Sequence, residues 1–82
     1  PFSVDRESTL RALNSSNPEM RKAISLLLKY GMENMDTSLK TELTAKLRTL
    51  SEKDPFFLEG GYPVRDEAGR TLSFIEQDPE GN

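Results

Sequence analysis

One stretch of the chain has the pattern of a buried helix with well-defined ends: residues 17–31, NPEMRKAISLLLKYG. Asn17 precedes Pro18, and a residue before proline avoids the α region. Asn17 is therefore expected to be the N-cap and Pro18 the first helical residue. Gly31 is expected to end the helix in the left-handed conformation. Apolar residues at helical spacing predict one buried face, made of Met20, Ala23, Ile24, Leu27 and Leu28.

The same helix carries a second apolar face. Leu26 and Tyr30 are four residues apart and lie off the predicted buried stripe. A helix with two apolar faces is either central in a bundle or presents one face to a partner. This surplus of apolar residues is the first indication of a protein–protein contact.

A shorter helix is expected before this segment and a longer one after it. The first covers about residues 4–14, with Ser3 as its cap. The other runs from about Thr37 to Lys53 and is capped by Asp36. The predicted core stripe of this longer helix is Leu39, Leu43, Leu47 and Leu50.

The connection between the second and third helices is open to two interpretations. Met32 and Met35 continue the helical spacing across Gly31, so the two segments would form one long helix kinked at the glycine. A break is favoured, because glycine costs about 1 kcal/mol inside a helix and Asp36 is a good cap.

The last third of the chain has a different pattern and is predicted to form a β-hairpin. Residues 62–65 and 70–75 have the composition of strands, and residues 66–69 that of a four-residue loop ending in glycine. An isolated hairpin is only marginally stable in water, so it must pack on the helices or on another chain. Alternation predicts one buried face, made of Tyr62, Val64, Leu72 and Phe74.

The predicted fold class is therefore mainly α with a small β element: a three-helix bundle followed by a C-terminal β-hairpin. A chain of 82 residues is expected to form one domain. Residues 1–54 would form the helical bundle, and residues 55–76 a hydrophobic linker and the hairpin packed on it. Residues 77–82 have the composition of a disordered acidic tail.

The composition argues against an enzyme. The chain has no cysteine and no histidine, which excludes thiol chemistry and removes the commonest general base and metal ligand. The acidic pair Glu33 and Asp36 lies at a helix junction, and the pair Asp66 and Glu67 lies in the predicted hairpin loop, where such residues have structural roles. We therefore predict no catalytic residue, no metal, no cofactor and no small-molecule substrate.

Charge and hydropathy patterning favour a soluble protein. The chain has 11 basic and 14 acidic residues, a net charge of −3, which does not favour general binding to polyanions. The longest apolar run, Leu26–Leu28, is far shorter than the roughly 18 residues that span a bilayer. The N-terminus has no signal-peptide pattern. A cytoplasmic protein without membrane contact is the expectation.

The remaining class of function is binding to a protein. The chain has more apolar residues than three short helices need, and methionine is frequent at adaptable binding surfaces. A small core without disulfides also makes oligomerisation a natural source of stability. We predict a small non-enzymatic adaptor, assembly or regulatory protein that acts through apolar helix faces, and we expect a homodimer. The predicted partner-binding residues are Leu26, Tyr30, Met32, Met35, Phe56 and Phe57.

An alternative function is a nucleic-acid-binding regulator that uses the third helix. Hydroxyl and cationic side chains on one side of that helix could contact phosphates. They are Lys40, Thr41, Thr44 and Arg48. The acidic balance of the chain is far from the basic character of such proteins, so this alternative is not favoured.

Overall fold

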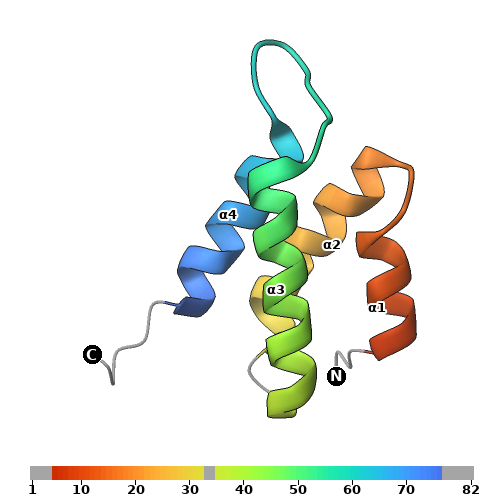
Figure 1. The fold of residues 1–82 in the computed structure, drawn as a ribbon, viewed down its shortest axis with the longest axis vertical. Helices are drawn as coiled ribbons and strands as arrows, with labels where there is room; N and C mark the ends of the chain where they lie inside the picture. The colour runs from red at the N-terminus through yellow and green to blue at the C-terminus, as the bar shows by residue number, and fades with distance from the viewer. Residues whose placement is uncertain (1–4, 33–34, 77–82) are drawn as a thin grey trace.

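The computed structural model describes residues 5–32 and 35–76, which form helices joined by short turns and one longer loop (Figure 1). The helices are α1 (Arg6–Leu13), α2 (Pro18–Gly31), α3 (Thr37–Lys53) and α4 (Pro63–Glu76). No strand forms among the described residues; Leu58 and Gly61 make an isolated bridge in the loop before α4. The predicted acidic tail at residues 77–82 lies outside the described residues.

The starts of α2 and α3 confirm the capping residues expected from the sequence. Asn17 Oδ1 accepts a hydrogen bond from the Glu19 backbone N–H at 2.9 Å, directly before Pro18. Asp36 Oδ1 accepts one from the Leu39 N–H at 3.3 Å. These bonds satisfy donors that the first helical turn leaves without an intrahelical partner, and so they fix where each helix begins.

α1 begins later than the sequence suggests. Its N-cap is Asp5, whose Oδ2 accepts a hydrogen bond from the Ser8 N–H at 2.9 Å. The predicted cap, Ser3, lies outside the described residues. Hydrogen bonds from Ser8 hold the pKa of the Asp5 carboxyl below its ordinary value, because they favour the charged form.

The end of α2 differs from the prediction, while the break after it is confirmed. α2 runs through Gly31 in helical conformation, and Met32 follows as C-cap with φ −72° and ψ −25°. Gly31 therefore does not take the left-handed position. Met32 is only 3% exposed, and the extra helical residue is what brings its side chain into the core. α3 is a separate helix, and residues 33–34 lie outside the described part of the chain.

The predicted C-terminal β-hairpin is wrong, because residues 63–76 form α4. This helix starts as α2 does, with a residue before proline: the Tyr62 carbonyl accepts the Asp66 N–H at 3.0 Å, and Pro63 is the first helical residue. A hairpin would have buried Tyr62 and Phe74 together, but they are 36% and 51% exposed. The residues that are buried follow helical spacing: Val64, Glu67, Ala68, Thr71 and Leu72.

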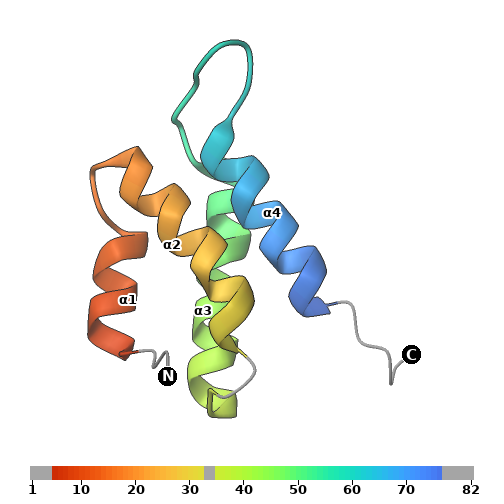
Figure 2. The ribbon, with the colours of Figure 1, turned by 180° about the vertical axis from the view of Figure 1, so that it is seen from behind.

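α4 packs against both α2 and α3, while α1 packs mainly on α2 (Figures 1 and 2). Thr71 Oγ1 donates a buried hydrogen bond to the Ser25 carbonyl of α2 at 2.7 Å. As a helix, residues 63–76 can bury one apolar side against α2 and α3 at once. As a strand, this segment would bury only alternate residues on one face. This is why the helix prevails over the hairpin. The buried apolar core is Leu13, Leu28, Met32, Leu43, Leu47, Leu50, Val64, Ala68 and Leu72.

Replacing Gly69 with alanine distinguishes the helix from the hairpin in solution. Gly69 lies inside α4, and an added Cβ would meet no heavy atom within 4 Å. We expect G69A to raise the free energy of unfolding by about 0.5–1 kcal/mol, since glycine loses more backbone entropy than alanine. Urea denaturation followed by circular dichroism measures this change.

The control for G69A is the same change at Gly60, in the loop before α4. Gly60 has a φ of 83°, which a residue with a Cβ adopts only under strain. G60A should therefore lower the free energy of unfolding. If G69A also lowers it, residue 69 does not lie in a helix in solution.

Candidate functional site

An apolar surface lies on the side of α2 that points away from the core. The exposed fraction of its four large side chains runs from 38% for Leu26 to 71% for Tyr30. Figure 2 shows α2 between α1 and α4, and no described element covers its outward side. We name this surface the α2 outer face; it consists of Met20, Ala23, Leu26, Leu27 and Tyr30.

The α2 outer face corrects the predicted orientation of this helix. The sequence pattern assigns Met20, Ala23 and Leu27 to the buried side, and the structure exposes all three. Of the same predicted stripe, Ile24 and Leu28 do point inward. Hydrophobicity alone gives no signal for this difference, because both sides of α2 are apolar.

The small side chain of Ser25 decides which side of α2 is buried. Its hydroxyl donates to the Arg21 carbonyl at 2.7 Å, within its own helix, and its carbonyl accepts the bond from Thr71. A short side chain satisfied in this way can be fully buried and lets α4 approach closely. Because successive residues of a helix are about 100° apart, burying Ser25 and Leu28 turns Leu26 and Leu27 outward.

Phe74 of α4 extends the apolar surface beyond α2. It is 51% exposed and follows Thr71 by three residues, so the two side chains lie on the same side of α4. Since Thr71 contacts Ser25, that side of α4 faces α2. α2 and α4 run in the same general direction (Figure 2). Phe74 therefore lies on the α2 side of α4, at the level of the C-terminal half of α2.

Charged residues frame the α2 outer face. Glu19 lies in the first turn of α2 and Lys29 in the last turn. Each charge is favourable at its end of the helix dipole. Glu19 and Lys22 are exposed and Lys29 is half-buried, and Lys22 lies between the other two along the helix. The rim of the apolar face thus begins with an acidic side chain and ends with a basic one.

The structure does not bring the six predicted partner-binding residues together. Leu26 and Tyr30 belong to the α2 outer face. Met32 is buried in the core, and Met35 and Phe56 are half-buried and pack against it. These three side chains pack in or against the core and expose little surface to a partner.

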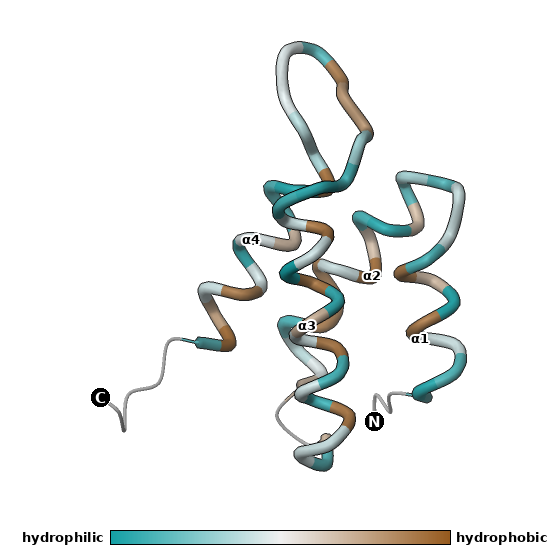
Figure 3. The backbone as a smooth tube through the Cα atoms, in the orientation of Figure 1, coloured by the Kyte–Doolittle hydropathy of each residue, from teal (hydrophilic) through white to brown (hydrophobic). Residues whose placement is uncertain are grey.

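Phe57, the sixth of these residues, lies in the loop between α3 and α4. It is 57% exposed, and its ring packs edge-on against Tyr62 with the centroids 5.1 Å apart. The Arg65 guanidinium in turn lies 3.8 Å from the Tyr62 ring centroid. Figure 3 shows hydrophobic residues along one limb of this loop, which projects at one end of the molecule. The loop is a second exposed apolar feature, separate from the α2 outer face.

The residues of the nucleic-acid alternative all lie on α3, and one of its two cationic side chains is paired within the chain. Thr41 and Arg48 are exposed, whereas Lys40 and Thr44 are half-buried. The Arg48 guanidinium donates to the Glu76 carboxylate of α4, so its charge is neutralised within the chain.

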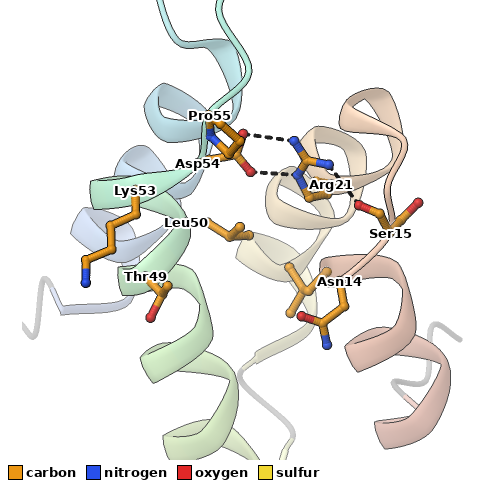
Figure 4. A pocket seen from close by; sticks show the side chains of 9 residues that line it. Asn14, Ser15, Arg21, Thr49, Leu50, Lys53, Asp54 and Pro55 are labelled. Atoms are coloured by element: carbon orange, nitrogen blue, oxygen red, sulfur yellow. Dashed lines mark hydrogen bonds and ion pairs between the residues drawn. The ribbon is translucent and has the colours of Figure 1, made fainter.

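A pocket of about 310 Å³ opens where the end of α1, the start of α2 and the end of α3 meet (Figure 4). Its wall contains an ion pair in which Arg21 Nε and Nη2 donate to Asp54 Oδ2 and Oδ1 at 2.6 and 3.0 Å. Arg21 Nη1 donates to the Ser15 carbonyl at 2.8 Å. The hydrogen bond to Asp54 raises the pKa of Arg21, so the guanidinium stays protonated.

Hydrogen bonds to Asp54 join several parts of the chain at this junction. Asp54 Oδ1 also accepts the Phe56 N–H at 3.1 Å, and the Asp54 carbonyl accepts a hydrogen bond from Arg65 Nε at 2.7 Å. The Asp54 carboxylate thus connects α2, the end of α3 and the loop toward α4. Its negative charge is paired with the guanidinium of Arg21. Among the described residues no group of three acidic side chains could hold a metal ion. The sequence contains no signal for this pair, because residues 21 and 54 are far apart in the chain and no local pattern relates them.

No protein-family model, curated protein or solved structure matches this chain. None of the described helices is both long and apolar enough to cross a bilayer.

Proposed function

We propose that this protein is a small non-enzymatic interaction module that binds a helical protein segment on the α2 outer face and Phe74. The observation that carries the proposal is that five exposed apolar residues lie on one side of α2, with exposed Phe74 on the side of α4 that faces α2. Side chains of this size expose on the order of 500 Å² of apolar surface, the upper end of what a monomer shows.

The core does not need these residues. Leu28 and eight other apolar residues already form a buried cluster, so the outward side chains of α2 add exposed surface without adding to the packing inside. Burying apolar surface would stabilise the protein by roughly 25 cal/mol for each Å², and surface that stays in water lacks this stabilisation. Association with a partner recovers this free energy, and tyrosine, such as Tyr30, is among the residues that contribute most at interfaces.

The shape of the surface favours a helix as the bound element. Met20, Ala23, Leu27 and Tyr30 follow the spacing of one continuous stripe, and Leu26 widens it. Such a stripe forms the ridges and grooves into which a second helix packs. Phe74, on the side of α4 that faces α2, would extend the contact with such a helix. Adaptor, assembly and regulatory proteins all use contacts of this kind.

A synthetic amphipathic helical peptide, with leucines along one face and Glu and Lys along the other, tests the proposal. We expect the peptide to shift the amide resonances of α2 and of the residues around Phe74 in a two-dimensional NMR titration. L27S should weaken the peptide affinity by at least about tenfold, because it removes an apolar contact at the centre of the surface.

The matched control for L27S is L58S in the loop before α4. Leu27 and Leu58 are 46% and 48% exposed, so the two substitutions remove similar apolar surface from different places. L58S should leave the peptide affinity unchanged. Equal losses in both variants, or peptide shifts confined to the loop, would place the binding surface away from α2.

The nucleic-acid alternative is checked with a fluorescently labelled DNA duplex at low salt. We expect no change in its anisotropy, because Arg48 is paired with Glu76 and the chain carries a net charge of −3. Salt-dependent binding that R48E abolishes and L27S does not affect would favour the alternative function.

A further inference from the structure

We infer that the α2 outer face takes the same face of a second copy of this chain, with the two α2 helices antiparallel across a two-fold axis. This inference rests on the proposed function and names its partner. Two-fold dimers are the commonest protein assemblies, and each patch in them must complement itself. The distribution of charge and of side-chain size along α2 meets this requirement.

Charge complementarity selects the antiparallel arrangement. Glu19 and Lys29 lie in the first and last turns of α2, about 15 Å apart along the axis. In an antiparallel pair centred near Ser25, Glu19 of one copy lies about 3 Å along the axis from the level of Lys29 of the second copy, within reach of its long side chain, at both ends of the interface. A parallel pair would instead place Glu19 level with Glu19 and Lys29 level with Lys29. The helix dipoles also oppose each other favourably in the antiparallel pair.

The apolar residues are symmetric about a point one residue, or about 1.5 Å, further along α2 than the midpoint of Glu19 and Lys29. Met20 and Tyr30 lie five residues before and after Ser25, so an axis at the level of Ser25 brings Met20 of one copy against Tyr30 of the second. Ala23 and Leu27 straddle the axis and would pack against each other. The small Ala23 side chain leaves room for the opposite leucine, as interdigitated helix packing requires.

The available surface fits a reversible dimer. Interfaces of standard size bury about 800 Å² on each partner, and on the order of 500 Å² of apolar area with a charged rim approaches this value. Nine apolar residues form a buried core within each copy, so the interface is not needed to complete that core. We expect a dissociation constant in roughly the micromolar range.

Sedimentation equilibrium of charge-exchange variants tests the orientation. E19K and K29E should each weaken the dimer by about tenfold, because each puts like charges opposite one another twice in the dimer. The double variant E19K/K29E should restore the dimer to within a few-fold of the original. In a parallel pair, the single variants would only exchange one like-charge pair for another and would not weaken it.

The matched control is E7K, which makes the same charge change in the first turn of α1 and away from the proposed interface. It should leave the dimer unchanged, and thermal unfolding of each variant checks that α2 is intact. A dimer that L27S does not weaken, or whose single charge variants behave like E7K, would overturn this inference.

The two proposals fail in different ways. A chain that stays monomeric at every concentration and still binds the amphipathic peptide overturns self-association and leaves the interaction module standing. A chain that stays monomeric and does not bind the peptide overturns both. A dimer dispersed by L27S and restored by the double charge exchange supports both.

Discussion

Replacing Asp54 with alanine is expected to lower the free energy of unfolding by roughly 3–5 kcal/mol. The Asp54 side chain is 1% exposed and that of Arg21 is 12% exposed. Removing the carboxylate would leave a guanidinium buried without its counter-charge, and this costs more than losing the hydrogen bonds alone. A small domain has a total stability on the order of 5–10 kcal/mol. D54A should therefore have a substantial unfolded fraction near body temperature.

Urea denaturation of D54A, beside E42A as the control, measures this effect. Glu42 forms an equally well-aligned pair with Arg6, at 2.9 and 2.8 Å. Its side chain and that of Arg6 are 41% and 59% exposed, so water screens the charges and E42A should cost at most about 1 kcal/mol. Similar losses in the two variants would contradict a special role for the buried pair.

A double replacement separates the charge from the packing at this junction. In R21M/D54L both charges are removed and the volume is largely kept, so no ion is left unpaired. Such replacements are often neutral or even stabilising. We expect the double variant to recover most of the stability that D54A loses. If it remains as unstable as D54A, the hydrogen bonds to Ser15 and Phe56 matter more than the charge balance.

Replacing Leu28 with alanine is expected to lower the free energy of unfolding by about 3–4 kcal/mol. Leu28 has no exposed surface, and truncating it both forfeits the transfer of its methyl groups from water and leaves a cavity. α4 and α1 both pack against α2, and a close-packed interior relaxes only partly around such a cavity.

The matched control is L26A, the same change two residues earlier in the same helix. Leu26 is 38% exposed on the α2 outer face, so its loss should cost the monomer less than about 1 kcal/mol. Guanidinium denaturation at a low protein concentration, where the monomer prevails, compares the two. Equal costs would mean that the side of α2 carrying Leu26 is also buried in solution.

Local signals in the sequence predicted where α2 and α3 begin. Asn17 and Asp36 begin α2 and α3 as expected, and α3 covers the predicted range Thr37–Lys53. A cap depends on hydrogen bonds between residues two or three apart, and a proline restricts its own neighbour. Nothing distant is needed to decide these positions.

The segment at residues 63–76 could not be assigned in the same way. Its residues contain both an alternating pattern and a helical one, and Gly69 suits a loop as well as it suits a tolerated helix position. Tyr62 followed by Pro63 repeats the start of α2 and was the available signal for a helix. What decided between the patterns was that, as a helix, this segment packs against both α2 and α3.

In the candidate site, too, local sequence predicted some features and tertiary contacts decided the others. An excess of apolar surface on α2 was evident from Leu26 and Tyr30, but the pattern placed Met20 and Leu27 inside, whereas they are exposed. Phe74 and the Arg21–Asp54 pair were absent from the predicted site, because they depend on contacts between residues far apart in the chain.

By itself, the sequence determined where α2 and α3 begin, that α2 has two apolar sides, and that cysteine and histidine chemistry is absent. Only the tertiary structure decided that residues 63–76 are helical and that Ser25 and Leu28, not Leu27, face inward. Helix starts are set by hydrogen bonds within one turn. The choice of the buried side depends on how closely α4 can approach, and the contact between Ser25 and Thr71 fixes that approach.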